Sequence, residues 1–203
     1  MTTVILFGAT GKTGLALSKL IIKNDMELFA AARTETDRKY LESLGANAFI
    51  ADVLHPNQSL ESMRNVNGRS IVISLVGGSS KGTGVRADYL GNKNIIEAAV
   101  TSGLKRFIFV TSIGSGESRH ELPDVVKPFL GPIAAEKTKA ENVLRETDLD
   151  FTIIRPGQLT DDRATGNGAL TEECILGIMT REDLALMIMN CIKDDGTIAK
   201  IYS

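Results

Sequence analysis

The chain has 203 residues, of which 43% are hydrophobic, and its formal net charge at pH 7 is −2. This length favours a single domain over residues 1–203, and the small negative charge argues against a general nucleic-acid-binding protein, which needs a face-wide basic excess. No apolar run reaches transmembrane length, so we expect a cytoplasmic protein without a membrane partner. Two cysteines and two histidines lack the spacing of a zinc site, and no metal site is predicted.

The first element predicts an anion-binding turn. Residues 4–7 form an apolar run typical of a buried parallel strand, and Gly8-Ala9-Thr10-Gly11-Lys12-Thr13-Gly14 follows it. In a strand–turn–helix unit, Gly8 allows the tight turn, Gly11 lets the backbone approach a phosphate, and Gly14 lets the helix pack closely on the strand. The free N–H groups at the helix start would face the anion.

We therefore predict that this turn binds the pyrophosphate of a dinucleotide. The spacing GxxGxxG differs from the commoner GxGxxG, so the position between a strand and a helix carries the prediction. A glycine-rich loop that binds nothing is the alternative. The candidate cofactor-binding residues here are Gly8, Thr10, Gly11, Lys12, Thr13 and Gly14.

Strand-like runs then recur with room for a helix between each pair. We predict strands at 3–7, 27–32, 47–51, 70–76, 106–112, 151–155 and 198–202, and helices at 12–23, 36–44, 58–64, 84–102, 134–147 and 181–193. This alternation is the signature of right-handed βαβ units. The predicted fold class is α/β: a Rossmann-like three-layer sandwich with a doubly wound, mainly parallel sheet of about seven strands and a small C-terminal cap region.

Three irregular stretches are predicted to form the substrate side of a site. Residues 77–84 follow the fourth strand, residues 113–133 follow the fifth, and residues 157–179 are the expected cap. Open α/β sheets bind ligands at the carboxyl ends of their strands, where the strand order reverses, here between the first and fourth strands. Surface decoration is the alternative for each loop.

With these pieces, the chain resembles the atypical short-chain dehydrogenase/reductases. It is most similar to the NAD(P)H-binding NmrA-like branch, which includes biliverdin-IXβ reductase, also known as flavin reductase. The likeness covers nearly the whole chain. Besides the glycine turn, it rests on Ala51-Asp52-Val53, Val110-Thr111-Ser112, Lys137-Thr138-Lys139-Ala140-Glu141 and Thr152-Ile153-Ile154-Arg155-Pro156-Gly157.

The predicted cofactor is NADPH. An NAD-preferring site usually holds an acidic residue at the end of the second strand, where this chain has Arg33. A guanidinium there suits the 2′-phosphate of NADP, and Arg38 or Lys39 lies within reach on the following turn. An Arg33 side chain that merely points into water is the alternative.

The resemblance also implies further cofactor contacts. Asp52 and Val53 would flank the adenine, although Asp52 could equally be a cap for the next turn. Leu75, Val76 and Gly77 would run beside the nicotinamide ribose. The remaining candidate cofactor-binding residues are Ser112, Lys137 and Pro156.

Ordinary members of the family use a serine and a Tyr-x-x-x-Lys set, and this chain departs from that pattern. Ser112 and Lys137 match the serine and the lysine and are the candidate catalytic residues, but Ile133 stands at the tyrosine position. A positioned general acid is worth about 10²–10⁴-fold, so the chain is poorly equipped to reduce an unactivated ketone. We therefore predict an NADPH-dependent reductase that transfers hydride to a flavin or a biliverdin-like tetrapyrrole.

The acceptor is expected to be the small-molecule partner of a monomer or weak homodimer. Candidate partners for its propionate or phosphate groups are Lys81, Arg86, Arg119, Lys127 and Arg163, although each could be an ordinary solvated charge. Two other functions stay open. One is a non-catalytic NAD(P)H sensor that regulates a protein partner. The other is a reductase or isomerase of a small carbonyl metabolite, with His120 or a bound water in place of tyrosine.

Overall fold

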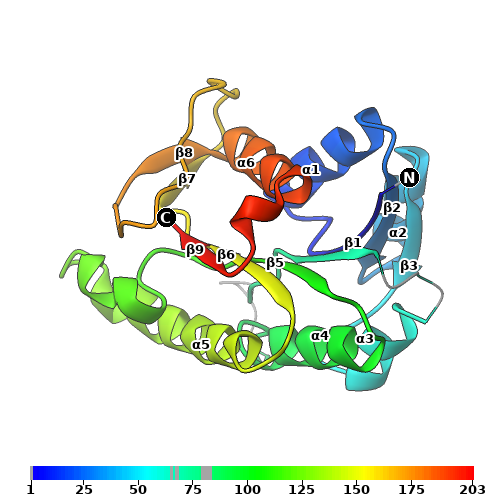
Figure 1. The fold of residues 1–203 in the computed structure, drawn as a ribbon, viewed down its shortest axis with the longest axis horizontal. Coiled ribbons are helices and arrows are strands. Elements are labelled where there is room, and N and C mark those ends of the chain that lie inside the picture. The colour runs from blue at the N-terminus through cyan, green and yellow to red at the C-terminus, as the bar shows by residue number, and fades with distance from the viewer. Residues whose placement is uncertain (1, 65, 67–68, 79–83) are drawn as a thin grey trace.

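The computed structural model describes residues 2–64, 66, 69–78 and 84–203. Seven parallel strands form one sheet in the order β3-β2-β1-β4-β5-β6-β9 (Figure 1). These strands are β1 (Thr3–Phe7), β2 (Glu27–Ala32), β3 (Asn47–Ile50), β4 (Ile71–Ser74), β5 (Arg106–Val110), β6 (Asp150–Ile154) and β9 (Lys200–Tyr202). The strand order reverses between β1 and β4, as predicted. The doubly wound, Rossmann-like α/β fold is thereby confirmed.

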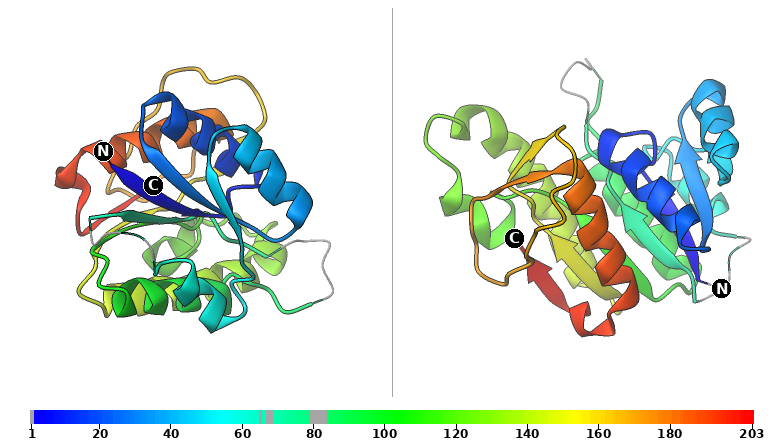
Figure 2. Two further views of the ribbon diagram at one scale, coloured as in Figure 1. Left: turned by 90° about the vertical axis from the view of Figure 1, so that its right-hand side faces the viewer. Right: turned by 90° about the horizontal axis from the view of Figure 1, so that it is seen from above.

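Helices cover both faces of this sheet (Figure 2). One face carries α1 (Lys12–Lys23), α2 (Glu35–Ser43) and α6 (Arg181–Lys193), and the other carries α3 (Pro56–Glu61), α4 (Leu90–Thr101) and α5 (Lys127–Arg145). Two short 3₁₀ helices are η1 (Gly116–Glu121) and η2 (Asp195–Thr197). None of the described helices has the length and apolar character that crossing a membrane requires.

The expected cap between residues 157 and 179 contains a second, two-stranded sheet. Its strands, β7 (Gln158–Thr160) and β8 (Ile178–Thr180), pair in parallel and lie beside α6 (Figure 1). Because β8 leads directly into α6, the cap is attached to the start of the helix that packs against α1.

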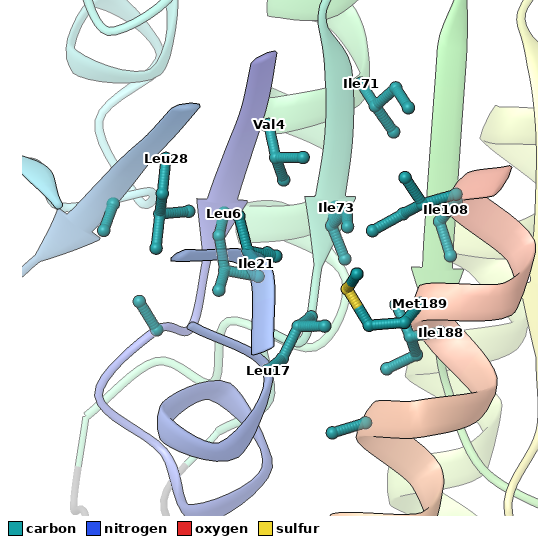
Figure 3. Close-up of a cluster of buried hydrophobic side chains, with 14 of the residues drawn as sticks. Val4, Leu6, Leu17, Ile21, Leu28, Ile71, Ile73, Ile108, Ile188 and Met189 are labelled. Carbon is teal, nitrogen blue, oxygen red and sulfur yellow. The ribbon is translucent and has the colours of Figure 1, made fainter. Parts of the chain in front are cut away.

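Alternation along β1 divides the core into two layers. Val4 and Leu6 point to the α1 and α6 side, whereas Ile5 and Phe7 point to the α4 and α5 side. Figure 3 shows the first layer, in which the side chains of α1 and α6 meet those of β1 and β4. Burial of each such aliphatic side chain contributes roughly 1.5–3 kcal/mol. The sheet therefore gives a rigid base to the loops at its carboxyl edge.

Helix α5 begins seven residues earlier than the start predicted at residue 134, at Lys127. The prolines had suggested a loop throughout residues 113–133, but Pro128 lies in the first turn, where a helix needs no N–H donor. Pro132 lies within the helix and forgoes one hydrogen bond, that to the carbonyl of residue 128. The irregular stretch after β5 is thus shorter than predicted, and η1 forms part of it.

Helix α4 begins at Leu90, whereas the pattern had predicted residue 84. The side chain of Asn92 explains the late start, because its Nδ2 donates to the carbonyls of Val76, Ala87 and Asp88. These bonds hold the residues just before α4 against the end of β4 in a non-helical path.

Helix α1 approaches the end of β1 very closely. A Cβ atom added to Gly14 would lie 2.1 Å from the carbonyl oxygen of Gly8 and 2.8 Å from Cα of Ala9. Both neighbours are backbone atoms, which cannot rotate away as a side chain does. The role predicted for Gly14, close packing of the helix on the strand, is the one that the structure shows.

We expect Gly14→Ala to lower the free energy of unfolding by about 1–3 kcal/mol, the usual cost of forcing an extra group into a packed site. Gly131→Ala is the matched control, because Gly131 is also helical and a Cβ there would meet nothing within 4 Å. That variant should be unchanged or gain up to about 1 kcal/mol from alanine's better helix propensity. Urea denaturation measures both, and equal effects would contradict the steric argument.

Candidate active site

The glycine turn has the geometry of an anion-binding site. Gly8 has a φ of +84°, and the amide of Gly11 donates to the carbonyl of Gly8 at 3.1 Å. Gly11 caps α1 with an extended backbone, forms no side-chain cap hydrogen bond, and precedes a first turn without acidic residues. The amide-rich, partly positive end of α1 is therefore free of a capping side chain.

Two pockets lie on either side of this turn. We call them the Arg33 pocket, of about 470 Å³, and the Lys137 pocket, of about 320 Å³. Both are lined by Gly8, Gly11 and Leu75, so they adjoin near the point where the strand order reverses, and we call the two together the groove.

The structure places most of the predicted cofactor-binding residues in this groove. The Arg33 pocket is lined by Gly8, Thr10, Gly11, Arg33, Asp52, Val53, Leu75, Val76 and Gly77. The Lys137 pocket is lined by Gly8, Gly11, Lys12, Thr13, Gly14, Leu75, Lys137 and Pro156.

Arg33 is exposed at the end of β2, and its pocket also contains the carboxylate of Asp52. In the described part of the chain, no carboxylate pairs with the Arg33 guanidinium. Asp52 does act as a cap, since its Oδ1 accepts from the amide of Leu54 at 3.0 Å. The two roles weighed for Asp52 are therefore compatible, because the same residue caps a turn and lines the pocket.

Two predicted residues lie outside both pockets. The guanidinium of Arg38 pairs with Glu35 at 2.5 Å and with Glu42, one turn away on the same helix. Its charge is thus shared with two carboxylates of α2, and its predicted contact with the 2′-phosphate stays a prediction. Ser112 is half-buried after β5; its neighbour Thr111 lines the Lys137 pocket, but Ser112 does not.

Lys137 reaches its pocket from the middle of α5, with only 11% of its side chain exposed. Its Nζ lies 3.5 Å from Oδ1 of Asp88, a carboxylate that is itself 1% exposed. Burial lowers the pKa of Lys137, and the Asp88 carboxylate opposes that shift. Ile133 lies one turn before Lys137, so no phenol stands at that position.

Sequence reasoning missed the polar residues that support the groove. Asp88 holds the segment after β4, because its Oδ2 accepts from the amide of Gly78 at 2.9 Å. Asn92 accepts from Ser74 Oγ at 2.6 Å, and Asn94 donates to the carbonyl of Val53 at 2.8 Å. The sequence did contain a signal for the two asparagines. Asn92 and Asn94 are poor helix formers in the first turns of a helix, a position that favours a hydrogen-bonding role for their side chains.

The wall behind the Lys137 pocket contains a buried ion pair. The guanidinium of Arg155, 2% exposed, donates to Glu141 at 2.6 Å and to Glu117 at 2.8 Å. Thr111 also donates to Glu141, at 2.6 Å. Hydrogen bonds from Arg155 lower the pKa of Glu117 to about 2. This network ties the ends of β5 and β6 to α5 and η1, and so fixes the position of Pro156.

The cap is joined to the glycine turn by Asp161. Its carboxylate pairs with Lys12, the first residue of α1. It also pairs with Arg181, the first residue of α6, and the guanidinium nitrogen lies 2.6 Å from Oδ1 of Asp161. These contacts lower the pKa of Asp161, chiefly through the bond from Lys12. Lys12 and Arg181 both line the Lys137 pocket, so Asp161 pairs with two cations of that lining.

Among the basic residues predicted to meet an acceptor, Arg86 lines the Arg33 pocket. Arg86 donates to Asp88 at 2.8 Å and to the carbonyl of Gly78, and Lys127 pairs with Asp124. Arg119 and Arg163 are exposed and line neither pocket, and Lys81 lies outside the described residues.

His120 is 72% exposed on η1, where it lies 3.0 Å from Glu121, and it lines neither pocket. This position gives no support to His120 as a replacement acid. Within the described residues, no group of three or more His, Cys, Asp or Glu side chains is placed to hold a metal ion.

Comparisons with known proteins agree with this geometry. A family model described as NAD(P)H-binding matches residues 8–195. A Bacillus subtilis (strain 168) protein named uncharacterized sugar epimerase YhfK is 30% identical over 199 residues, 96% of this chain and 89% of that protein. Sanguinarine reductase of Eschscholzia californica is 28% identical over 200 residues, 81% of this chain and 71% of that protein.

A solved structure gives a further likeness. ChuY from Escherichia coli O157:H7, described as an anaerobilin reductase, matches with a TM-score of 0.92 and 30% identity. The match covers 100% of this chain and 96% of the other.

We expect Gly11→Val to abolish NADPH binding while the protein stays folded. A Cβ on Gly11 would touch only the carbonyl oxygen of Gly8, at 3.4 Å, so the fold has room for it, but a branched side chain would fill the space of the pyrophosphate. Calorimetry measures binding and circular dichroism the fold, with Gly11→Ala as a smaller step. Normal binding by a folded Gly11→Val protein would place the phosphate site elsewhere.

Proposed function

Because the chain belongs to the NAD(P)H-binding family, we propose that it is an NADPH-dependent reductase of a conjugated acceptor, a flavin or a biliverdin-like tetrapyrrole. Membership confirms the short-chain dehydrogenase/reductase resemblance that the motifs indicated. One observation carries the proposal. The buried Lys137 lies in the groove, whereas the position one turn earlier holds Ile133, and none of the three tyrosines lines either pocket.

The residues of the groove fit NADPH from end to end. The amides at the start of α1 would hold the pyrophosphate, Arg33 the 2′-phosphate, and Lys137 the hydroxyls of the nicotinamide ribose. NADPH supplies the hydride when bound. The chain's own contribution is to bind the cofactor rigidly and to align its reactive end with the acceptor.

The absence of a tyrosine acid limits the acceptors that such a site can reduce. A simple ketone needs a proton donor beside its oxygen, because hydride addition concentrates negative charge on that one atom. In a flavin or a linear tetrapyrrole, the charge spreads over a conjugated system and solvent can supply the proton. The site is therefore suited to acceptors that need alignment more than acid catalysis.

The names of two relatives support a reductase. ChuY is described as an anaerobilin reductase, a name that gives a bilin as its substrate, and sanguinarine reductase is the second. The relative named as a sugar epimerase points to carbonyl chemistry instead, which the groove serves poorly because a tyrosine is missing from it.

NADPH should bind at least tenfold more tightly than NADH. A charge-assisted hydrogen bond from Arg33 to the 2′-phosphate contributes about 1.5–3 kcal/mol, which corresponds to roughly tenfold to a hundredfold. Arg33→Glu should erase or reverse the preference. Arg38→Gln is the matched control and should leave it unchanged, because Arg38 pairs with its own helix. Equal calorimetric affinities of the wild type for the two cofactors would remove the basis of the assignment.

The acceptor is tested by steady-state oxidation of NADPH with FMN, biliverdin, a quinone and a simple aldehyde. We expect turnover of the conjugated acceptors, a loss of about tenfold in Ser112→Ala, whose role is orientation, and a larger loss in Lys137→Ala. Ile133→Tyr should change flavin reduction little while raising any aldehyde activity. Efficient turnover of the aldehyde alone would sink the proposal, and NADPH binding without turnover of any acceptor would favour the sensor.

A further inference from the structure

We propose that Asp88 is a positioning residue of this site: it holds the ammonium of Lys137 in the groove and keeps it charged. The inference rests on the proposed function, in which Lys137 binds the nicotinamide ribose. It adds a residue that lines neither pocket and that no motif of the sequence singles out.

The two oxygens of Asp88 have different environments. Oδ2 accepts from the amide of Gly78 at 2.9 Å and from Nε of Arg86 at 2.8 Å. Oδ1 lies 3.5 Å from Nζ of Lys137 and has no hydrogen-bond partner among the described residues. One oxygen is thus fixed to the backbone after β4, and the other is left facing the lysine.

This arrangement places one carboxylate behind both halves of the groove. A Cβ added to Gly77, which lines the Arg33 pocket, would lie 3.4 Å from Oδ1 of Asp88 and 3.7 Å from Nζ of Lys137. Lys137 itself lines the other pocket. Asp88 therefore lies between the segment after β4 and Lys137 of α5.

Lys137 needs such a partner because it is nearly buried. Desolvation disfavours its charged form, and an amine that loses its proton binds ribose hydroxyls more weakly. Three charged groups act on it: Asp88 and Glu141 favour the ammonium, and Arg86 disfavours it. Glu141 is already committed to Arg155 and Thr111, which leaves Asp88 as the nearest carboxylate with a free acceptor.

The test is the pH dependence of NADPH binding in Asp88→Asn, which keeps the size of the side chain and an acceptor for Gly78 but removes the charge. The Kd of the wild type should stay nearly constant between pH 7 and 9, where the 2′-phosphate of NADPH is fully ionised. In Asp88→Asn we expect the Kd to rise by roughly tenfold over that range. A drop of one unit in the lysine pKa lowers the charged fraction of Lys137 up to tenfold at high pH, and only the charged form binds the ribose well.

Two double variants separate this role from a structural one. In a Lys137→Met background, Asp88→Asn should change the Kd by less than about twofold, because the lysine on which it acts is gone. In a Lys137→Arg background, the pH dependence should disappear, because a guanidinium stays protonated. The same loss of affinity at every pH and in both backgrounds would show that Asp88 acts only through Gly78, and would overturn the proposal.

Asp88→Ser, measured in the same way, replaces Asp88→Asn if that variant does not fold. The readout is binding rather than hydride transfer, so the two proposals can fail separately. A wild type that binds no NADPH refutes the proposed function, whereas normal binding with the same pH profile in the folded Asp88 variants refutes only the role of Asp88.

Discussion

The contact between the start of α1 and the end of β1 determines most of what surrounds it. At this point helix and strand are so close that a Cβ on Gly14 would overlap the backbone of Gly8. The close approach directs the first amides of α1 toward the edge of the sheet, and it presses Leu17 and Ile21 onto Val4 and Leu6 (Figure 3). Helix α6 packs against α1 and carries the cap, so the position of the cap follows from the same contact.

The parts of the molecule that the sequence predicts are those that depend on local pattern. The strands appear as apolar runs, and the spacing of the turn reveals why Gly8 is needed for its positive φ and Gly14 for its close packing. The supports of the groove are different, because Asp88 and Asn92 act through partners distant in the chain, such as Lys137 and Ser74. The start of α5 was missed because proline usually ends a helix, whereas Pro128 lies in its first turn. The ion pairs of Arg38 with Glu35 and Glu42 on its own helix could not be read from the spacing of cofactor motifs.

Two buried ion pairs in this protein differ in how fully their hydrogen bonds are satisfied. Arg155 donates to Glu141 and to Glu117, and Glu141 also accepts from Thr111. The charged groups of this pair therefore have several hydrogen-bond partners each. Removing one partner from such a pair typically costs 3–5 kcal/mol, as expected of a structural element. The pair of Lys137 and Asp88 is longer and leaves one carboxylate oxygen without a hydrogen-bond partner among the described residues, and its lysine lines the groove.

The groove consists of two pockets joined over a single turn, and this division has a consequence for binding. A dinucleotide that occupies both pockets behaves as a bivalent ligand: once one half is bound, the other is held at a high effective concentration beside its own pocket. Each mononucleotide half needs only a modest affinity, because the link between them supplies the rest. Gly8 and Gly11 line both pockets, so the pyrophosphate that links the two halves of a dinucleotide would pass over this turn. A bulky side chain at Gly11 would therefore leave both pockets in place but prevent one ligand from occupying them together.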